Sequence, residues 1–194
     1  MCEKRFYLTF DGAPNPPGTD KILQVLAHHA VPAAFFMEGR RLETEAECAR
    51  RVRDAGHDVG NHTYNHPTFD AISLAECLEE VTRTDDILEA ELGRRPTLLR
   101  PPFGILTPAT QQVLLERGYT IVLWSVSIRD WEGPDAGAIA QRLLQQVRDG
   151  AIVVFHDHVP WNPDALDIVI PALRDQGYTF GRISEIARGS GIIR

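Results

Sequence analysis

The chain has 194 residues, of which 43% are hydrophobic and 24% charged, values that are ordinary for a globular protein. No stretch has the roughly 20 apolar residues that a membrane-spanning helix needs. The net charge of −7 comes without a basic stripe, which disfavours nucleic acid and anionic membrane as partners. We therefore expect a single domain over residues 1–194, with neither nucleic acid nor membrane as a partner.

The first residues lead directly into an apolar pattern, without the apolar segment and small-residue cleavage site of a secretory signal. We therefore expect a cytoplasmic protein, unless the chain is a mature form or an excised domain of a secreted protein. Cys2, Cys48 and Cys77 are odd in number, far apart and without a CxxC pair. This pattern favours free thiols over a disulfide framework or a zinc knuckle.

Short apolar runs alternate with helical patterns along the whole chain. Strands are predicted at residues 6–10, 33–37, 58–61, 98–100, 120–124, 151–155 and 178–180. Helices are predicted at residues 20–30, 44–55, 73–92, 108–117, 138–148 and 164–176. The third helix begins with a capping box, Ser73 and Glu76, and ends at Gly93, a residue suited to a helix end.

This alternation predicts an α/β fold with parallel strands and outer helices, either a barrel or an open doubly wound sheet. Both architectures place the active site at the carboxyl ends of the strands. Polar residues follow the apolar runs at these places, namely Asp11, His62, Arg100, Asp130 and His156. We expect these five residues to meet at one edge of the sheet.

His62 and His66 form the most informative pair. At positions i and i+4 of a helical turn, their imidazoles would lie on one side, about 5–6 Å apart at Cβ, and could bind one divalent ion. The alternative is a pair of unrelated loop histidines. Their place directly after a predicted strand favours the metal site.

The roles of the remaining polar residues stay open from the residues alone. Asp11, before a Gly/Pro turn, could form that turn, bind a metal or act as general base. His156 could be a core histidine or a general acid, since its ordinary pKa of about 6.5 suits proton donation to an amine; Asp157 could orient it or cap the next turn. Arg100 could hold a carboxylate or be solvated. Trp124, Trp131 and Trp161 could stack on a sugar or pack in the core.

Five segments, in this order, resemble the motifs of the polysaccharide deacetylases of carbohydrate esterase family 4, the NodB-homology domain. Residues 9–14 resemble the first motif, residues 62–66 match H-[ST]-x-x-H, residues 100–104 match R-x-P-[YF]-G, residues 127–131 are similar to D-x-x-D-W, and residues 155–157 are similar to L-H-D. The resemblance extends from about residue 6 to residue 178.

The resemblance implies a distorted (β/α)7-type barrel and a hydrolase that removes N- or O-acetyl groups from carbohydrate. It also implies a divalent metal, usually zinc and sometimes cobalt or nickel. The implied metal ligands are His62, His66 and Asp11. The implied catalytic residues are Asp11, His156, Arg100 and Asp130, and the implied substrate contacts are Pro102, Phe103, Trp131 and Phe155.

In this hydrolytic hypothesis, the metal polarises the substrate carbonyl and activates a water, and Asp11 accepts the proton of that water. Arg100 positions Asp11, and a backbone N–H near Phe103 helps to stabilise the oxyanion. His156 then protonates the leaving nitrogen.

Two departures from the family motifs motivate rival hypotheses. The first motif usually has a second Asp that binds the metal, and this position is Gly12 here; the usual partner of the third-motif arginine is Ser127 here. These changes leave the base and the acid in place, but they motivate a degenerate carbohydrate-binding domain without catalysis. The missing secretion signal motivates a third hypothesis, the hydrolysis of a small cyclic or metabolite amide.

Overall fold

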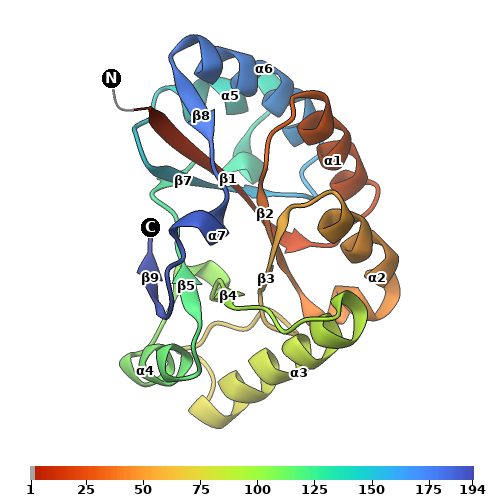
Figure 1. Ribbon diagram of the computed structural model, residues 1–194, viewed down its shortest axis with the longest axis vertical. Helices are drawn as coiled ribbons and strands as arrows, with labels where there is room; N and C mark the ends of the chain where they lie inside the picture. Colours follow the sequence, from red (N-terminus) through yellow and green to blue (C-terminus); the bar gives the residue numbers. More distant parts are fainter. Residues whose placement is uncertain (1–2) are drawn as a thin grey trace.

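The strands of the sheet all pair in parallel, as the alternation of apolar runs and helical patterns predicts. The computed structural model describes residues 3–194 (Figure 1). Its strands are β1 (Lys4–Ala13), β2 (Ala34–Met37), β3 (Asp58–Asn61), β4 (Leu98–Leu99), β5 (Thr120–Val122), β6 (Val126–Ser127), β7 (Ala151–His156), β8 (Tyr178–Phe180) and β9 (Gly191–Ile193). Its helices are α1 (Gly18–His28), α2 (Gly39–Asp54), α3 (Leu74–Leu92), α4 (Pro108–Glu116), α5 (Ala136–Leu144), α6 (Asn162–Asp175) and α7 (Ile183–Ile186), with short 3-10 turns η1 (Pro102–Gly104) and η2 (Asp130–Glu132).

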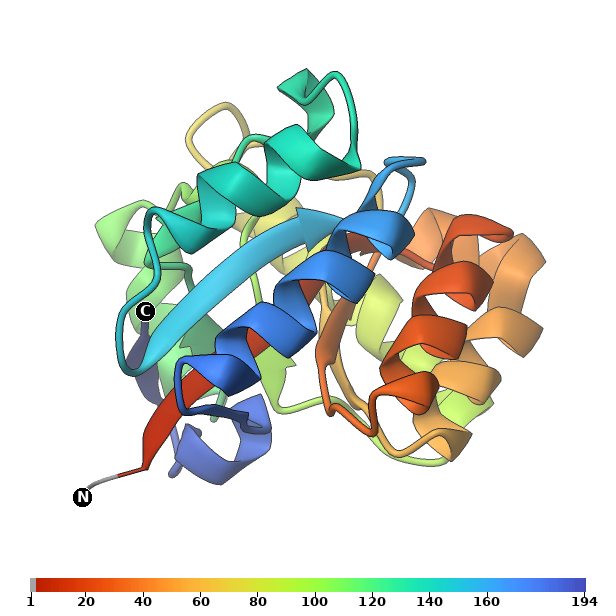
Figure 2. The ribbon, with the colours of Figure 1, turned by 90° about the horizontal axis from the view of Figure 1, so that it is seen from above.

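The strand order is β6-β7-β1-β2-β3-β4-β5-β9, with β8 paired to the first residues of β1. The curved sheet forms a half-barrel with helices around it, as Figures 1 and 2 show from two directions. This confirms the predicted distorted barrel. Within the described residues the sheet has nine strands, because β6 and β9, which are only two and three residues long, add to the seven that were predicted.

The two faces of β1 have different neighbours. Phe6, Leu8 and Phe10 belong to the main hydrophobic core that the sheet forms with its helices. Tyr7 packs in a smaller apolar cluster with Phe36 on the opposite face. Because side chains alternate along a strand, Asp11 points to the same face as Tyr7. The apolar alternation of this strand therefore directs the Asp11 carboxylate away from the main core.

The helix ends show which local signals were informative. The capping box of Ser73 and Glu76 is formed at the start of α3, and Gly93 ends this helix in a left-handed conformation, both as predicted. In contrast, α2 begins at Gly39 rather than at the predicted residue 44. A Cβ atom on Gly39 would lie 2.5 Å from Oγ1 of Thr84, so only glycine lets α2 begin this close to α3.

Two further predictions concern membranes and thiols. Within residues 3–194, no helix combines the length and the apolar character needed to cross a bilayer. Cys48 and Cys77 are buried free thiols, as predicted, whereas Cys2 lies outside the described residues.

Candidate active site

A cavity of about 320 Å³ opens at the carboxyl ends of the strands. Six of the predicted site residues line it, namely Asp11, His62, His66, Phe103, Trp131 and His156. Trp124, Ser127, Val154 and His158 complete its wall. The convergence of these distant segments follows from the parallel sheet, since strands that run the same way end at the same edge.

Asp11 and Arg100 form a buried ion pair at the floor of this cavity. The Arg100 guanidinium, which is 0% exposed, donates from Nη1 to Oδ1 of Asp11 at 2.7 Å and to Oγ1 of Thr9 at 2.7 Å. Its Nε donates to the Val122 carbonyl at 2.9 Å, and its carbon lies 4.2 Å from the centre of the Phe36 ring. The arginine is therefore a fixed partner of the carboxylate rather than a solvated loop residue.

The surroundings of Asp11 favour its ionised form. Burial alone would raise the pKa of this carboxyl, but the positive charge and hydrogen bond of Arg100, with smaller contributions from His62 and His156, outweigh it, so the pKa lies below its ordinary value. Oδ1 is held by the arginine, while Oδ2 lies 3.9 Å from Nε2 of His62. One carboxylate oxygen is thus fixed and the other faces the cavity.

His62 and His66 lie side by side, with ring centres 4.8 Å apart. The expected helical turn is wrong, because residues 62–66 form a loop in which Thr63 and His66 have positive φ angles of 67° and 62°. The Asn61 side chain accepts the Thr63 N–H at 2.7 Å, and Glu80 accepts the N–H groups of the next two residues. These side-chain bonds occupy the backbone N–H groups that a helix would use, so residues 62–66 form a loop. The two rings are therefore brought together by the loop and not by helical spacing.

Burial favours the neutral form of both imidazoles. It lowers the pKa of His62 below its ordinary value and is the largest cause that lowers the pKa of His66 to about 4. Nδ1 of His62 donates to the Arg100 carbonyl at 2.8 Å. The lone pair of this ring is therefore on Nε2, the atom that faces Asp11, as a metal-binding histidine requires.

His156 is held on the other side of the cavity by Asp130. Nδ1 of His156 donates to Oδ1 of Asp130 at 2.9 Å, and the backbone N–H of His156 donates to Oδ2 at 2.7 Å. Asn162, which no sequence motif indicated, donates to the same Oδ2 at 2.6 Å. Burial would lower the pKa of His156, but the hydrogen bond and charge of Asp130 raise it above its ordinary value.

Asp157 does not orient His156, which settles one of the open alternatives. Its Oδ2 accepts the Thr19 hydroxyl at 2.5 Å, and burial raises the pKa of this carboxyl to about 6. Its Oδ1 is buried and has no hydrogen-bond partner among residues 3–194. The orienting carboxylate is Asp130, which comes from a different segment of the chain.

Two implied substrate contacts need correction. Phe155 is 0% exposed and stacks on Phe10 in the main core, because it alternates with His156 and so points to the helical side of the sheet. Pro102, which belongs to the third motif itself, is buried and is not part of the cavity wall. The exposed aromatic side chains at the cavity are Phe103 and Trp131, and they contact the rings of His66 and His156.

Two side chains of the site, His62 and His66, are suited to bind one divalent cation. Two neutral imidazoles suit zinc, cobalt or nickel, and the fixed tautomer of His62 presents Nε2 as a ligand. Across residues 3–194, however, no three His, Cys, Asp or Glu side chains are already gathered at metal-binding spacing. The position that supplies the third ligand in the family motif is Gly12, which has no side chain.

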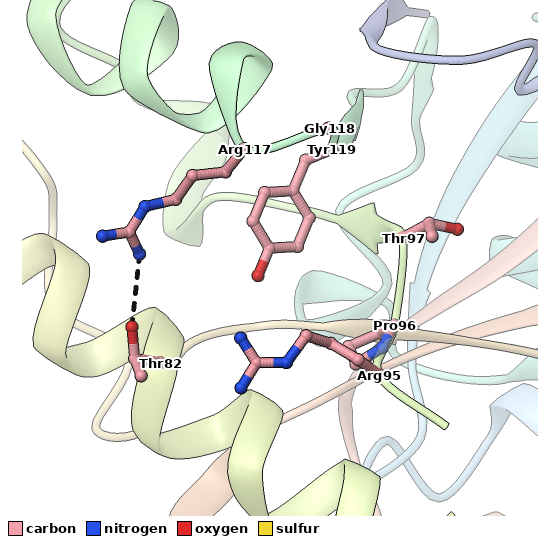
Figure 3. A pocket seen from close by; sticks show the side chains of 7 residues that line it. All are labelled: Thr82, Arg95, Pro96, Thr97, Arg117, Gly118 and Tyr119. Carbon is pink, nitrogen blue, oxygen red and sulfur yellow. Dashed lines mark hydrogen bonds between the residues drawn. The ribbon is translucent and has the colours of Figure 1, made fainter. Parts of the chain in front are cut away.

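A second pocket, of about 510 Å³, lies at the opposite end of β4 and β5 (Figure 3). Arg95 and Arg117 flank the Tyr119 ring there. Tyr119 donates its hydroxyl to Asp85, and Arg95 pairs with three carboxylates, those of Asp85, Asp86 and Glu89.

Comparison with known proteins links this geometry to a family. The sequence model of the polysaccharide deacetylase family matches residues 1–122. The chain is 35% identical to the peptidoglycan-N-acetylmuramic acid deacetylase PdaC of Bacillus subtilis over 95% of this chain and 39% of that protein. It thus spans about two-fifths of the length of this relative. The solved PdaC structure superposes with a TM-score of 0.88 at 35% identity, over 95% of this chain and 90% of that chain.

Two other solved structures are informative. A CE4 family pseudoenzyme from Bacillus anthracis superposes with a TM-score of 0.90 at 30% identity, over 95% of this chain and 66% of that chain. A family 4 acetyl xylan esterase from Clostridium thermocellum, solved with a cobalt ion, superposes with a TM-score of 0.87 at 29% identity, over 94% and 90%. The fold, the site and the matched sequence agree: the chain belongs to the polysaccharide deacetylase family, as the five motifs indicate.

Proposed function

We propose that the chain catalyses the metal-assisted removal of acetyl groups from N-acetylated carbohydrate, with Asp11 as base and His156 as acid. One observation carries this proposal: both groups face the same cavity, and their surroundings shift their pKa values in opposite directions. Two titratable groups with separated pKa values can be an ionised base and a protonated acid at the same pH.

Each group has one atom free for proton transfer. Arg100 holds Oδ1 of Asp11, so Oδ2 accepts the proton of the attacking water. Asp130 holds Nδ1 of His156, so Nε2 delivers the proton to the leaving nitrogen. We place an oxyanion-stabilising N–H at Phe103, whose positive φ of 58° is a strained conformation for a side chain of this size.

His62 and His66 are the ligands that we assign to a divalent cation, most readily zinc, with cobalt or nickel as alternatives. When bound, such a cation supplies Lewis-acid polarisation of the acetyl carbonyl. The cobalt ion in the Clostridium thermocellum relative supports a metal at this fold.

The exposed aromatic side chains support a carbohydrate substrate. Phe103 is 60% exposed and Trp131 is 52% exposed, and both line the cavity. Exposed rings beside a polar reaction centre offer flat surfaces on which a sugar can stack. The name of PdaC, an N-acetylmuramic acid deacetylase, supports an N-acetylated sugar as the substrate.

The test is acetate release from N-acetylglucosamine oligomers and from peptidoglycan fragments. The protein is stripped of metal and assayed before and after addition of zinc or cobalt. We expect acetate only after metal addition, and we expect the glucosamine product to accumulate in equal amount. Metal-loaded, folded protein that releases no acetate from any of these substrates would refute the proposal.

A second candidate, a non-catalytic carbohydrate-binding domain, is favoured by Gly12, by Ser127 and by the structural likeness to a pseudoenzyme. It predicts binding of the same oligomers without metal binding and without acetate release. Isothermal titration with the oligomers, run beside the acetate assay, separates the two candidates.

A further inference from the structure

The space beside Gly12 is bordered by polar atoms. Gly12 lies in the irregular part of β1, between Asp11 and Ala13, with a φ of 83°. A Cβ atom built on it would lie 3.5 Å from Oε1 of Glu38, and 4.0 Å from Oδ1 of Asp157 and from Nδ1 of His158. The nearest atom to the place where an acidic side chain would start is therefore a carboxylate oxygen from a neighbouring element.

Backbone bonds fix Glu38 between the end of β1 and the histidine loop. Its N–H donates to the Ala13 carbonyl at 2.8 Å, which holds it beside Gly12. The N–H of the next residue, Gly39, donates to the Thr63 carbonyl at 2.9 Å, which joins the start of α2 to the loop of His62 and His66. Glu38 is thus anchored to both segments that a cation site would need.

Glu38 is buried, at 7% exposed, and its two carboxylate oxygens have different surroundings. Oε2 accepts the Arg41 Nε–H at 3.1 Å, and Oε1 is the atom that faces Gly12. Oε1 is therefore the carboxylate oxygen that is available for a cation beside Gly12.

We infer that Glu38 supplies the third protein ligand of the cation bound by His62 and His66, in place of the acidic residue absent at Gly12. This rests on the proposed metal-assisted function. Met37 of β2 pairs with Ala13 of β1 and with Asn61 of β3, so Glu38 follows the strand that lies between residue 12 and the histidine loop. Carboxylate oxygen with two imidazoles is a ligand set typical of zinc.

Metal affinity tests this inference independently of turnover. Apo-protein is titrated with zinc by calorimetry and with cobalt by visible absorption. We expect Glu38→Gln to weaken cobalt binding at least about tenfold, since even changing an outer partner of a metal ligand costs about 10–100-fold. We also expect its cobalt spectrum to change, because a ligand is lost.

Glu47→Gln is the matched control. Glu47 lies on α2, the helix that begins directly after Glu38, and pairs with Arg50 at i,i+3, as Glu38 pairs with Arg41. We expect Glu47→Gln to bind both metals as the parent chain does. If Glu38→Gln does not fold, Glu38→Asp keeps the charge beside Arg41 but shortens the side chain, and we expect it to weaken metal binding as well.

A rescue variant tests the position directly. In the background of Glu38→Gln, Gly12→Asp adds a carboxylate where the family motif has one, and aspartate tolerates a positive φ better than most residues. The Cβ meets only ordinary contacts there. We expect this double variant to recover a large part of the lost affinity. No recovery, in a folded double variant, would contradict the shared site.

The outcomes separate this inference from the proposed function. If the parent chain binds metal and releases acetate but Glu38→Gln binds metal equally well, only the inference fails. If His158→Ala loses metal binding while His62→Ala retains it, the cation lies on the other side of Gly12 and the inference also fails. If the parent chain binds no metal, the proposed metal-assisted function fails with it.

Discussion

The two pockets of this molecule differ in how their charged groups are used. The pocket at the start of β4 and β5 is larger, about 510 Å³ against about 320 Å³, but its tyrosine and arginine side chains are already bonded to neighbouring side chains. Tyr119 donates to Asp85, and Arg95 is shared among three carboxylates. In the smaller cavity, each ion pair keeps one atom free to face the opening. Partly satisfied groups with separated pKa values, rather than volume, distinguish the candidate active site.

The largest effect on turnover is expected of Asp11→Asn, which tests whether the smaller cavity is the active site. The amide keeps the size of the side chain and a hydrogen-bond acceptor for Arg100 but cannot take a proton from water. We expect kcat to fall by about 10³–10⁴-fold, the upper part of the usual range for acid–base groups. Acetate release under saturating substrate and metal measures it. A loss of less than tenfold would show that another group is the base.

The next effect is that of His156→Ala. We expect kcat to fall by about 10²–10³-fold because the leaving nitrogen loses its proton donor. Metal affinity should stay unchanged, since His156 is not among the proposed ligands. Turnover and zinc titration on the same preparation test both parts, and unchanged turnover would refute the assigned role.

A smaller effect, on pH dependence, is expected of Asp130→Asn. The acid must be protonated, so activity falls as the pH rises through the pKa of His156, which Asp130 raises. Removal of that charge lets burial dominate and lowers this pKa. We therefore expect the alkaline limb of the kcat profile to move to lower pH, with a loss of roughly tenfold near pH 8. An unmoved limb would assign it to a different group.

The smallest effect on turnover is expected in the other pocket, from Tyr119→Phe. The lost hydroxyl leaves one oxygen of the buried Asp85 with fewer partners, which costs about 1–3 kcal/mol of unfolding free energy. Asn61 keeps its bond to the other oxygen, so the loop of His62 and His66 keeps its support. Denaturant unfolding should show the loss while kcat stays within about twofold. A large loss of turnover in a stable variant would show that this pocket takes part in function.

Much of the fold could be predicted because its signals are local. Alternation along β1 separates Phe6, Leu8 and Phe10 from Asp11, and the Ser73 capping box marks the start of α3. The strands β6 and β9 were not predicted because they do not follow a long helical pattern: β6 follows β5 without a helix between them, and β9 follows the four-residue helix α7.

The site was predicted where a residue directly follows a strand, and missed where support comes from elsewhere. Asn162 holds Asp130 from the first turn of α6, and Glu80 ties the histidine loop from α3. Neither contact follows from spacing in the sequence. The loop at residues 62–66 was expected to be a helical turn because spacing alone does not reveal positive φ angles.

The complete burial of Arg100 has an evolutionary consequence. A descendant that lost the Asp11 carboxylate but retained this guanidinium would keep an uncompensated charge in its interior. Such a loss costs about 3–5 kcal/mol, a large part of the 5–15 kcal/mol that holds a typical domain folded. The loss of stability therefore disfavours the loss of Asp11 alone. We expect Asp11 and Arg100 to disappear from a lineage together rather than one at a time.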